Sequence, residues 1–130
     1  MITTKEIRDW LKPQIPDISQ AYIGKTDPTK EKSICVYGRA SASNRIAVGG
    51  IANTTSANKT ISILVQWSKN ADTAEQAALT IYSLFEGKRT AINGTDCFFQ
   101  MMNDEPVPVG ANDHDIYEHV IDINIVYKRG

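Results

Sequence analysis

The sequence lacks the long apolar segments that anchor a protein in a membrane or direct its secretion. No apolar run approaches the roughly 18 residues that a membrane-spanning helix needs. The N-terminal stretch MITTKEIRDW also has no apolar core of the kind found in signal peptides. We therefore expect a soluble protein that is made in a reducing cytoplasm.

Cysteine is scarce, and the whole chain contains only Cys35 and Cys97. No CxxC or CxxH pair occurs, so the spacing of a zinc site is missing. Both cysteines lie in predicted strands, where two buried thiols are the expected arrangement and a disulfide is the alternative. We expect no metal site and no cofactor.

An excess of basic charge is absent too. The 130 residues include 14 basic and 15 acidic side chains, for a net charge of −1. A dedicated nucleic-acid-binding domain is usually distinctly basic, so the balance argues against tight DNA binding. The charge balance is compatible with DNA that passes near the protein without being bound tightly. The length suits a single domain, 1–130, with a core of its own.

Motifs of nucleotide binding and nucleophilic catalysis are also missing. The chain has no P-loop, no Gly-x-Gly-x-x-Gly and no Gly-x-Ser-x-Gly sequence. Ser68 and Lys69 lie near Asp72, which is explained better as the N-cap of a helix than as a catalytic acid. We predict no catalytic residue.

One dense polar cluster remains, the segment NDHDIYEH, which contains Asp113, His114, Asp115, Glu118 and His119. Side chains of these types bind metals or act as acid–base pairs. In a strand, however, neighbours such as Glu118 and His119 point to opposite faces of the sheet. We interpret the segment as a solvated turn followed by a strand, with a metal-dependent enzyme as the alternative.

The first half of the chain predicts a helix followed by strands. Thr3 and Glu6 have the spacing of a capping box, and prolines 13 and 16 would end the helix. Strands are predicted at 20–25 and 33–38, around a polar turn at 27–30. The segment 60–67 alternates, with one apolar face made of Ile61, Ile63, Val65 and Trp67. Leu64 breaks the alternation, which suggests that the second face is partly covered.

The second half predicts one further helix and more strands. The helix, residues 73–86, would begin at Asp72, end near Gly87 and pack on the sheet through Ala74, Ala78, Ile81 and Phe85. A strand with a turn at Asn93-Gly94 follows. Residues 103–115 are predicted as a loop because prolines interrupt a sheet ladder, and 115–129 as a long strand. The order indicates an α+β domain, with an N-terminal and a central helix packed on a mainly antiparallel sheet of four or more strands.

A long connection, residues 39–59, is predicted to be flexible because it is rich in small polar residues. Hairpin loops need only about two to five residues, so its length points to a function. Its apolar residues would contribute no stability while exposed to solvent, but a neighbouring molecule could bury them. The candidate contact residues for another subunit or a tail tube are Arg45, Ile46, Val48 and Ile51.

The segment ILVQWSKNADTAEQAALTIYSLFEG resembles the central strand–helix unit of the minor capsid proteins of long-tailed bacteriophages and prophages. That family is similar to phage tail terminator, or tail completion, proteins. Its strand ends in Gln66-Trp67-Ser68-Lys69, and an alanine-rich helix follows at once. The stretch FFQMM, the terminal segment PVPVGANDHDIYEHVIDINIVYKR and the N-terminal helix also fit, so the resemblance spans nearly the whole chain.

The resemblance implies a structural protein of the virion, in the tail or neck, that is made in the cytoplasm of a bacterial host. It implies a ring, expected to be a hexamer, that ends the tail tube and docks it to the head connector. The implied partners are further copies of the chain, the tail tube protein and head completion proteins, while genome DNA passes through. Trp67 and Asp72 then have a structural role as a scaffold joint between the strand and the helix: Trp67 closes the core and Asp72 caps the helix. Two alternatives stay open: another phage neck protein, and a cytosolic ligand-binding or metal-dependent domain.

Overall fold

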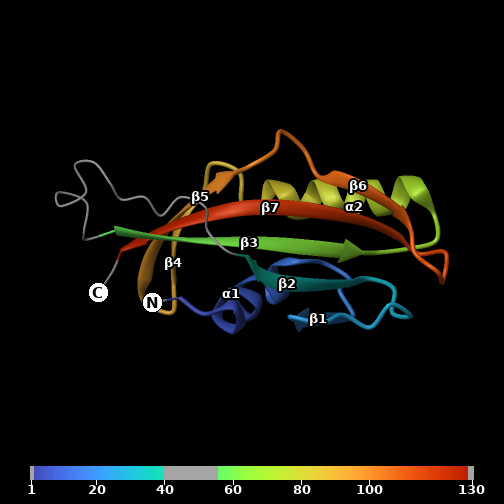
Figure 1. Cartoon of the computed structure of the whole chain (residues 1–130), viewed down its shortest axis with the longest axis horizontal. Helices are drawn as coiled ribbons and strands as arrows, with labels where there is room; N and C mark the ends of the chain where they lie inside the picture. The colour runs from blue at the N-terminus through green and yellow to red at the C-terminus, as the bar shows by residue number, and fades with distance from the viewer. Residues whose placement is uncertain (1, 40–55, 129–130) are drawn as a thin grey trace.

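The structure of the chain, a computed structural model, describes residues 2–39 and 56–128 (Figure 1). Its helices are α1 (Thr4–Leu11) and α2 (Ala71–Ser83), with a 3₁₀ turn, η1 (Lys12–Gln14), after α1. Its strands are β1 (Gln20–Ile23), β2 (Ser33–Arg39), β3 (Ser56–Gln66), β4 (Arg89–Ile92), β5 (Thr95–Met101), β6 (Val107–Ala111) and β7 (Tyr117–Lys128). They form one seven-stranded, mainly antiparallel sheet, which confirms the predicted α+β class.

The long strand β7 is the centre of the sheet, whose order is β1-β2-β3-β7-β5-β4. One edge of β7 pairs with the whole of β3. The other edge pairs with β6 near the start of β7 and with β5 near its end. The sheet curls so that β4 approaches α1, and the side chain of Asn93 contacts Glu6 there (Figure 1).

The capping box predicted for α1 is confirmed. The hydroxyl oxygen of Thr3 accepts from the backbone N–H of Glu6 over 3.1 Å, and the Glu6 carboxylate accepts from the N–H of Thr3 over 2.8 Å. Two donors that a helix start would leave unpaired are thereby satisfied. The helix ends at Leu11, and the 3₁₀ turn after it contains Pro13.

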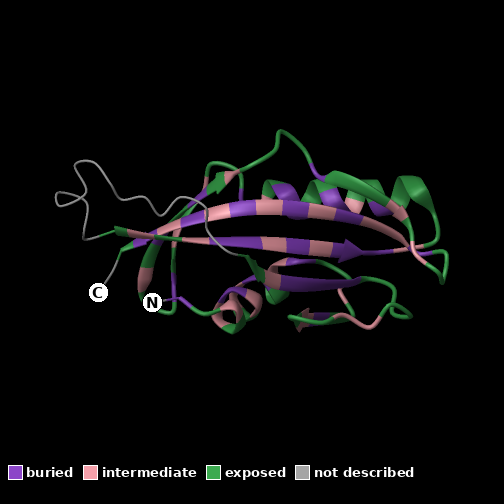
Figure 2. Ribbon diagram, viewed as in Figure 1, coloured by how far each residue is buried: buried purple, intermediate pink, exposed green. Residues whose placement is uncertain are grey.

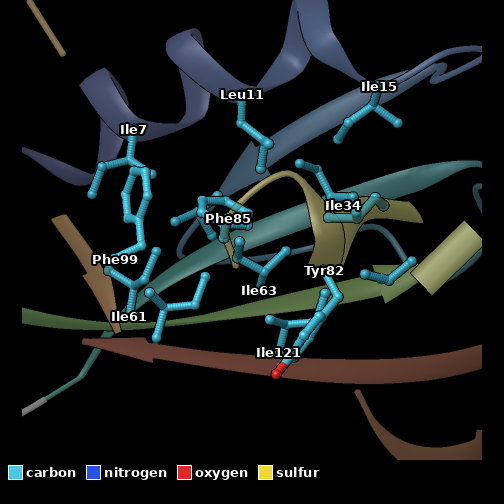
Figure 3. Packing of buried hydrophobic residues seen from close by; sticks show 14 of the residues in the cluster. Ile7, Leu11, Ile15, Ile34, Ile61, Ile63, Tyr82, Phe85, Phe99 and Ile121 are labelled. Atoms are coloured by element: carbon cyan, nitrogen blue, oxygen red, sulfur yellow. The ribbon is translucent and has the colours of Figure 1, made fainter. Parts of the chain in front are cut away.

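One face of the sheet forms the core together with both helices. Buried and half-buried residues accordingly alternate along β3 and β7 (Figure 2). Alternate residues of β3 and β7 are fully buried and pair across the strands, Ile61 with Ile123 and Ile63 with Ile121. From the helices, the buried side chains are Ile7, Leu11, Ala74, Ala78, Ile81 and Tyr82 (Figure 3 shows part of this set). The small alanines of α2 let its backbone lie close to β3 and β7, which it contacts.

Three aromatic rings join α1, the end of α2 and β5 within this core. Phe85 and Phe99 meet edge to face, with centroids 5.0 Å apart and planes at 89°. Trp10 lies 5.6 Å from Phe85 and 5.3 Å from Phe99. Each such pair contributes about 0.5–1.5 kcal/mol beyond the area that it buries.

The first two strands pair in parallel rather than as a hairpin around the polar turn. Gln20 lies beside Ser33, and Ile23 beside Val36, in the same direction. The connection 24–32 therefore has to return across the sheet. It leaves β1 through Gly24, whose φ of +74° suits glycine.

The predicted loop 39–59 is shorter at both ends in the structure. Arg39 is the last residue of β2, and β3 begins at Ser56 instead of residue 60. The polar start of β3 is held in the sheet by pairing with the end of β7, which overrides its weak strand propensity. Residues 40–55, with the predicted contact residues Arg45, Ile46, Val48 and Ile51, lie outside the described part of the chain.

The prediction of a loop at 103–115 is wrong in part, because it contains the strand β6. Pro108 lies opposite His119. The backbone groups of Tyr117 bond to Trp67 and Ser68 on the β3 side, so those of His119, two residues on, face β3 as well. The pair therefore exchanges no hydrogen bonds, and the N–H that proline lacks would lie at the free edge of β6. Pro108 therefore removes no backbone hydrogen bond between β6 and β7.

The two thiols, Cys35 and Cys97, are both free and buried, as the first of the two alternatives predicted. Among residues 2–39 and 56–128, neither helix has the length and apolar character needed to cross a bilayer.

Candidate functional site

The corner between β3 and α2, residues 67–70, is fixed by backbone hydrogen bonds. The N–H of Trp67 donates to the carbonyl of Tyr117 over 3.3 Å, and its carbonyl accepts from the N–H of Lys32 over 2.7 Å. The Trp67 side chain is 6% exposed and belongs to the core. Strand, helix and the β1–β2 connection are thus locked together at this corner.

The N-cap of α2 is Asn70, so the prediction that Asp72 caps this helix is wrong. The Asn70 side-chain oxygen accepts from the N–H of Thr73 over 2.9 Å. The hydroxyl of Ser68 accepts from the N–H of Asn70 and fixes the approach to the helix. Asp72 lies in the first turn, where a carboxylate interacts favourably with the helix dipole.

A hollow of about 200 Å³ lies beside this corner, between α2 and residues 15–17. Threonine and glutamine side chains of α2 line one wall, and Ile15 and Trp67 line the other. Asp17 is the one ionisable side chain in this lining, so the hollow contains no acid–base pair.

A polar cluster centred on Gln66, which we call the Gln66 hub, lies on the opposite side of the sheet from the core. Gln66 is fully buried, and its side-chain nitrogen donates to the carbonyls of Asp27 and Lys30, each over 2.7 Å. The same nitrogen lies 3.3 Å from the hydroxyl of Ser33. These bonds hold the β1–β2 connection against the end of β3.

Asn112 joins the turn between β6 and β7 to the Gln66 hub. Its side-chain nitrogen donates to the carbonyl of Pro28 over 3.1 Å and to the carboxylate of Glu118 over 3.2 Å. Its side-chain oxygen accepts from the N–H groups of His114 and Ile116. The NDHD segment is therefore a tight turn organised by one asparagine.

The ionisable side chains at 113–119 do not converge, in agreement with the sequence analysis. Glu118 faces Asn112 on one side of the sheet, and His119 is buried on the core side. Asp113, His114 and Asp115 are exposed in the turn. Within the described residues, no three His, Cys, Asp or Glu side chains are placed to bind a metal ion together.

His119 lies in a dry environment beside Val65 of β3. Its side chain is 8% exposed, and its Nδ1 has no hydrogen-bond partner among residues 2–39 and 56–128. Burial lowers the pKa of His119 below its usual value, and the charge of Glu75 on α2 opposes this effect.

The face of the sheet that carries the Gln66 hub, here called the helix-free face, is mostly polar. Asn124 donates to the side chains of Asn58 and Gln100 over 3.2 and 2.9 Å. Next to it, Asp122 accepts from the Ser62 hydroxyl and pairs with Arg39, whose Nη1 lies 3.0 Å away. Polar side chains with fixed partners in a flat array suit a wet protein–protein contact.

One apolar row crosses the helix-free face in register. It consists of Val107, Val120, Leu64, Cys35 and Tyr22, from five neighbouring strands. The apolar Leu64 predicted that this second face of the sheet is partly covered. The row is indeed covered at Cys35, which is 0% exposed. Burial raises the pKa of the Cys35 thiol, and burial together with Cys35 raises the pKa of Tyr37 to about 12. The row itself was missed because its members come from five separate segments.

The comparisons with known proteins identify the family. The sequence model of the family described as "Bacteriophage tail terminator protein" matches residues 6–129. The chain belongs to this family. It is therefore a structural protein of a phage tail, with its place in the virion, and the resemblance drawn from residues 64–87 is confirmed.

Other comparisons add little to this assignment. No curated protein matches this tail terminator. One solved structure of a protein without a descriptive name is 17% identical, covering 95% of this chain and 87% of that chain with a TM-score of 0.46. A likeness of that size carries no argument about function.

Proposed function

We propose that this tail terminator assembles into a closed ring, expected to be a hexamer, that ends the tail tube and docks it to the head connector. The observation that carries the proposal is the family match over residues 6–129. The rigid corner at Trp67 and the Gln66 hub support it. A ring closes only if every subunit holds its contacts at the same angle, and a rigid subunit does so.

The proposed ring contacts the tail tube protein on one side and head completion proteins on the other. Genome DNA passes through its opening without sequence-specific binding. The net charge of −1 suits passage, because tight binding to the phosphate backbone needs many basic side chains.

We also propose that residues 40–55 supply contacts to the tube or to the next subunit. This segment includes Arg45, Ile46, Val48 and Ile51. A partner could bury these apolar side chains, and the small polar residues around them let the segment change its backbone conformation with little loss of free energy. In this role the protein acts as a structural part and uses no catalytic group or metal.

The proposal is tested by the mass of the purified protein in solution. Light scattering should report six times the chain mass of 14.4 kDa, either alone or after addition of the tail tube protein. Negative-stain images should show rings at the ends of assembled tubes. A monomer under both conditions, with tubes of uncontrolled length, would contradict the proposed ring.

A further inference from the structure

Part of the apolar row on the helix-free face is open to solvent. Leu64 and Val120 lie directly opposite each other and are half-buried, and Val107 beside them is 39% exposed. We call these three residues the apolar strip. Cys35, the next member of the row, is already covered by the chain itself. Within residues 2–39 and 56–128, a second layer therefore lies over one half of the row and none over the other half.

The covering segment, residues 24–32, forms a wall beside the apolar strip and carries three lysines (Lys25, Lys30 and Lys32) with two acidic residues, Asp27 and Glu31. Lys25 follows Gly24, whose N–H donates to the carbonyl of Val36 over 3.0 Å, and the carbonyl of Lys30 accepts from Gln66. Both lysine side chains belong to exposed residues. In the described part of the chain, neither of them forms an ion pair.

The exposed side of α2 has the opposite character. Asp72, Glu75 and Leu79 follow one another at spacings of three and four residues, which places them on one side of the helix. We call them the α2 stripe. Leu79 is 41% exposed, and α2 contains no basic residue between Ala71 and Ser83. A surface of two carboxylates and one leucine thus complements an apolar strip beside a segment in which lysines outnumber acidic residues, and the Glu118 carboxylate next to the strip already accepts from Asn112.

The strand edges offer no comparable alternative. Pro108 removes a donor from the free edge of β6. At the edge of β1, the Arg8 guanidinium donates to the carbonyl of Ala21 over 3.3 Å. Extension of the sheet through β6 or β1 is therefore disfavoured, and the third edge strand, β4, lies against α1. A contact between faces is the better route.

We propose that the α2 stripe of one subunit packs on the apolar strip of the next, with its carboxylates facing Lys25 and Lys30. This inference rests on the proposed ring and names its subunit contact. The two surfaces differ and lie on different parts of one chain, so the contact is heterologous and repeats from copy to copy until a ring closes. A neighbour's helix would also complete the second layer of the sheet.

Charge reversal tests the pairing. Glu75→Lys and Lys30→Glu should each convert rings into monomers in light scattering at low salt, and the double variant should restore rings. Leu79→Ser and Val107→Ser should also give monomers with unchanged melting temperatures. The matched control is Val109→Ser, at a more exposed valine outside the apolar strip, which should keep the rings.

Disulfide trapping tests the same contact by a second route. The double variant Leu79→Cys with Val107→Cys should give a ladder of linked chains on oxidation by air with a copper catalyst, and the single variants should not. Rings that persist in all reversal variants, without a ladder, would overturn this contact but leave the proposed ring intact. A wild-type protein that never forms rings, with no ladder in the double variant, would overturn both.

Discussion

The side-chain nitrogen of Gln66 lies 2.7 Å from the carbonyl oxygen of Asp27, a residue 39 positions earlier in the chain. This bond explains how β1 and β2 can pair in parallel with so short a connection. The connection crosses the sheet end at Gln66, and the buried amide satisfies two of its carbonyls. Without such a partner, these partly buried carbonyls would each lack one hydrogen bond, which would disfavour this path.

Replacement of Gln66 by leucine should destabilise the protein by about 1–3 kcal/mol, because two partly buried hydrogen bonds, to the carbonyls of Asp27 and Lys30, are lost. Urea unfolding measures the loss. The control is Gln20→Leu, an exposed glutamine in the same row of the same face, for which a change within about 0.5 kcal/mol is expected. Equal losses for both variants would show that the Gln66 hub contributes nothing special.

The assignment of the α2 cap predicts a difference between two neighbouring residues. Asn70→Ala should reduce stability by about 1 kcal/mol, because the N–H of Thr73 loses its acceptor. Asp72→Ala should cost less, about 0.3–0.5 kcal/mol, since only a favourable charge near the helix start is lost. Thermal unfolding of both variants decides the matter, and the reverse order would restore Asp72 as the cap.

The aromatic cluster predicts a large effect for one phenylalanine and a small effect for another. Phe85→Ala should reduce stability by about 3–5 kcal/mol, because it leaves a cavity between Trp10 and Phe99. Phe98→Ala removes the same side chain from the helix-free face, where Phe98 is 39% exposed, and should cost far less. Similar losses in denaturant unfolding would contradict the placement of the core on one face.

The buried His119 predicts a pH dependence of stability. Its folded pKa is lowered by burial, so the unfolded chain takes up a proton first as the pH falls below about 6.5. The contribution of His119 to the free energy of unfolding is therefore fully present above that pH. Below it, the contribution declines by at most about 1.4 kcal/mol per pH unit. His119→Leu should flatten this part of the curve of unfolding free energy against pH. His114→Gln, at an exposed position, should leave the decline in place.

The segment between β2 and β3 is expected to serve assembly rather than folding. Replacement of residues 42–55 by a short Gly-Ser turn should leave circular dichroism and the melting temperature nearly unchanged, because the sheet pairs without it. Rings, or the joining of tails, should be lost. A shortened protein that still forms rings and completes tails would show that the segment is dispensable.

Local signals in the sequence were sufficient where neighbouring residues decide the structure. The Thr3–Glu6 box formed as predicted, and Asn93-Gly94 makes its turn with φ values of 51° and 83°. The alternation in β7 was read correctly because one face of a strand must be buried along its whole length. Such features need no knowledge of distant residues.

Distant contacts decided the features that the sequence analysis missed. Nothing near residues 20–38 shows that Gln66 will hold the connection, so parallel pairing could not be foreseen. From sequence alone, a proline indicates a loop. Pro108 is tolerated in a strand because its missing N–H lies at the unpaired edge of β6, which the sequence does not reveal. Asn70 and Asp72 are both good caps, and the Ser68 hydroxyl that orients Asn70 decides between them.

The position of β7 has a consequence for the order of events during synthesis. It is the strand that joins the β1–β2–β3 part of the sheet to β4, β5 and β6, and it is the last strand of the sheet in sequence. A nascent chain that still lacks β7 holds two unconnected pieces of sheet, neither with a complete core. The ribosome therefore has to deliver β7 before any stable subunit exists.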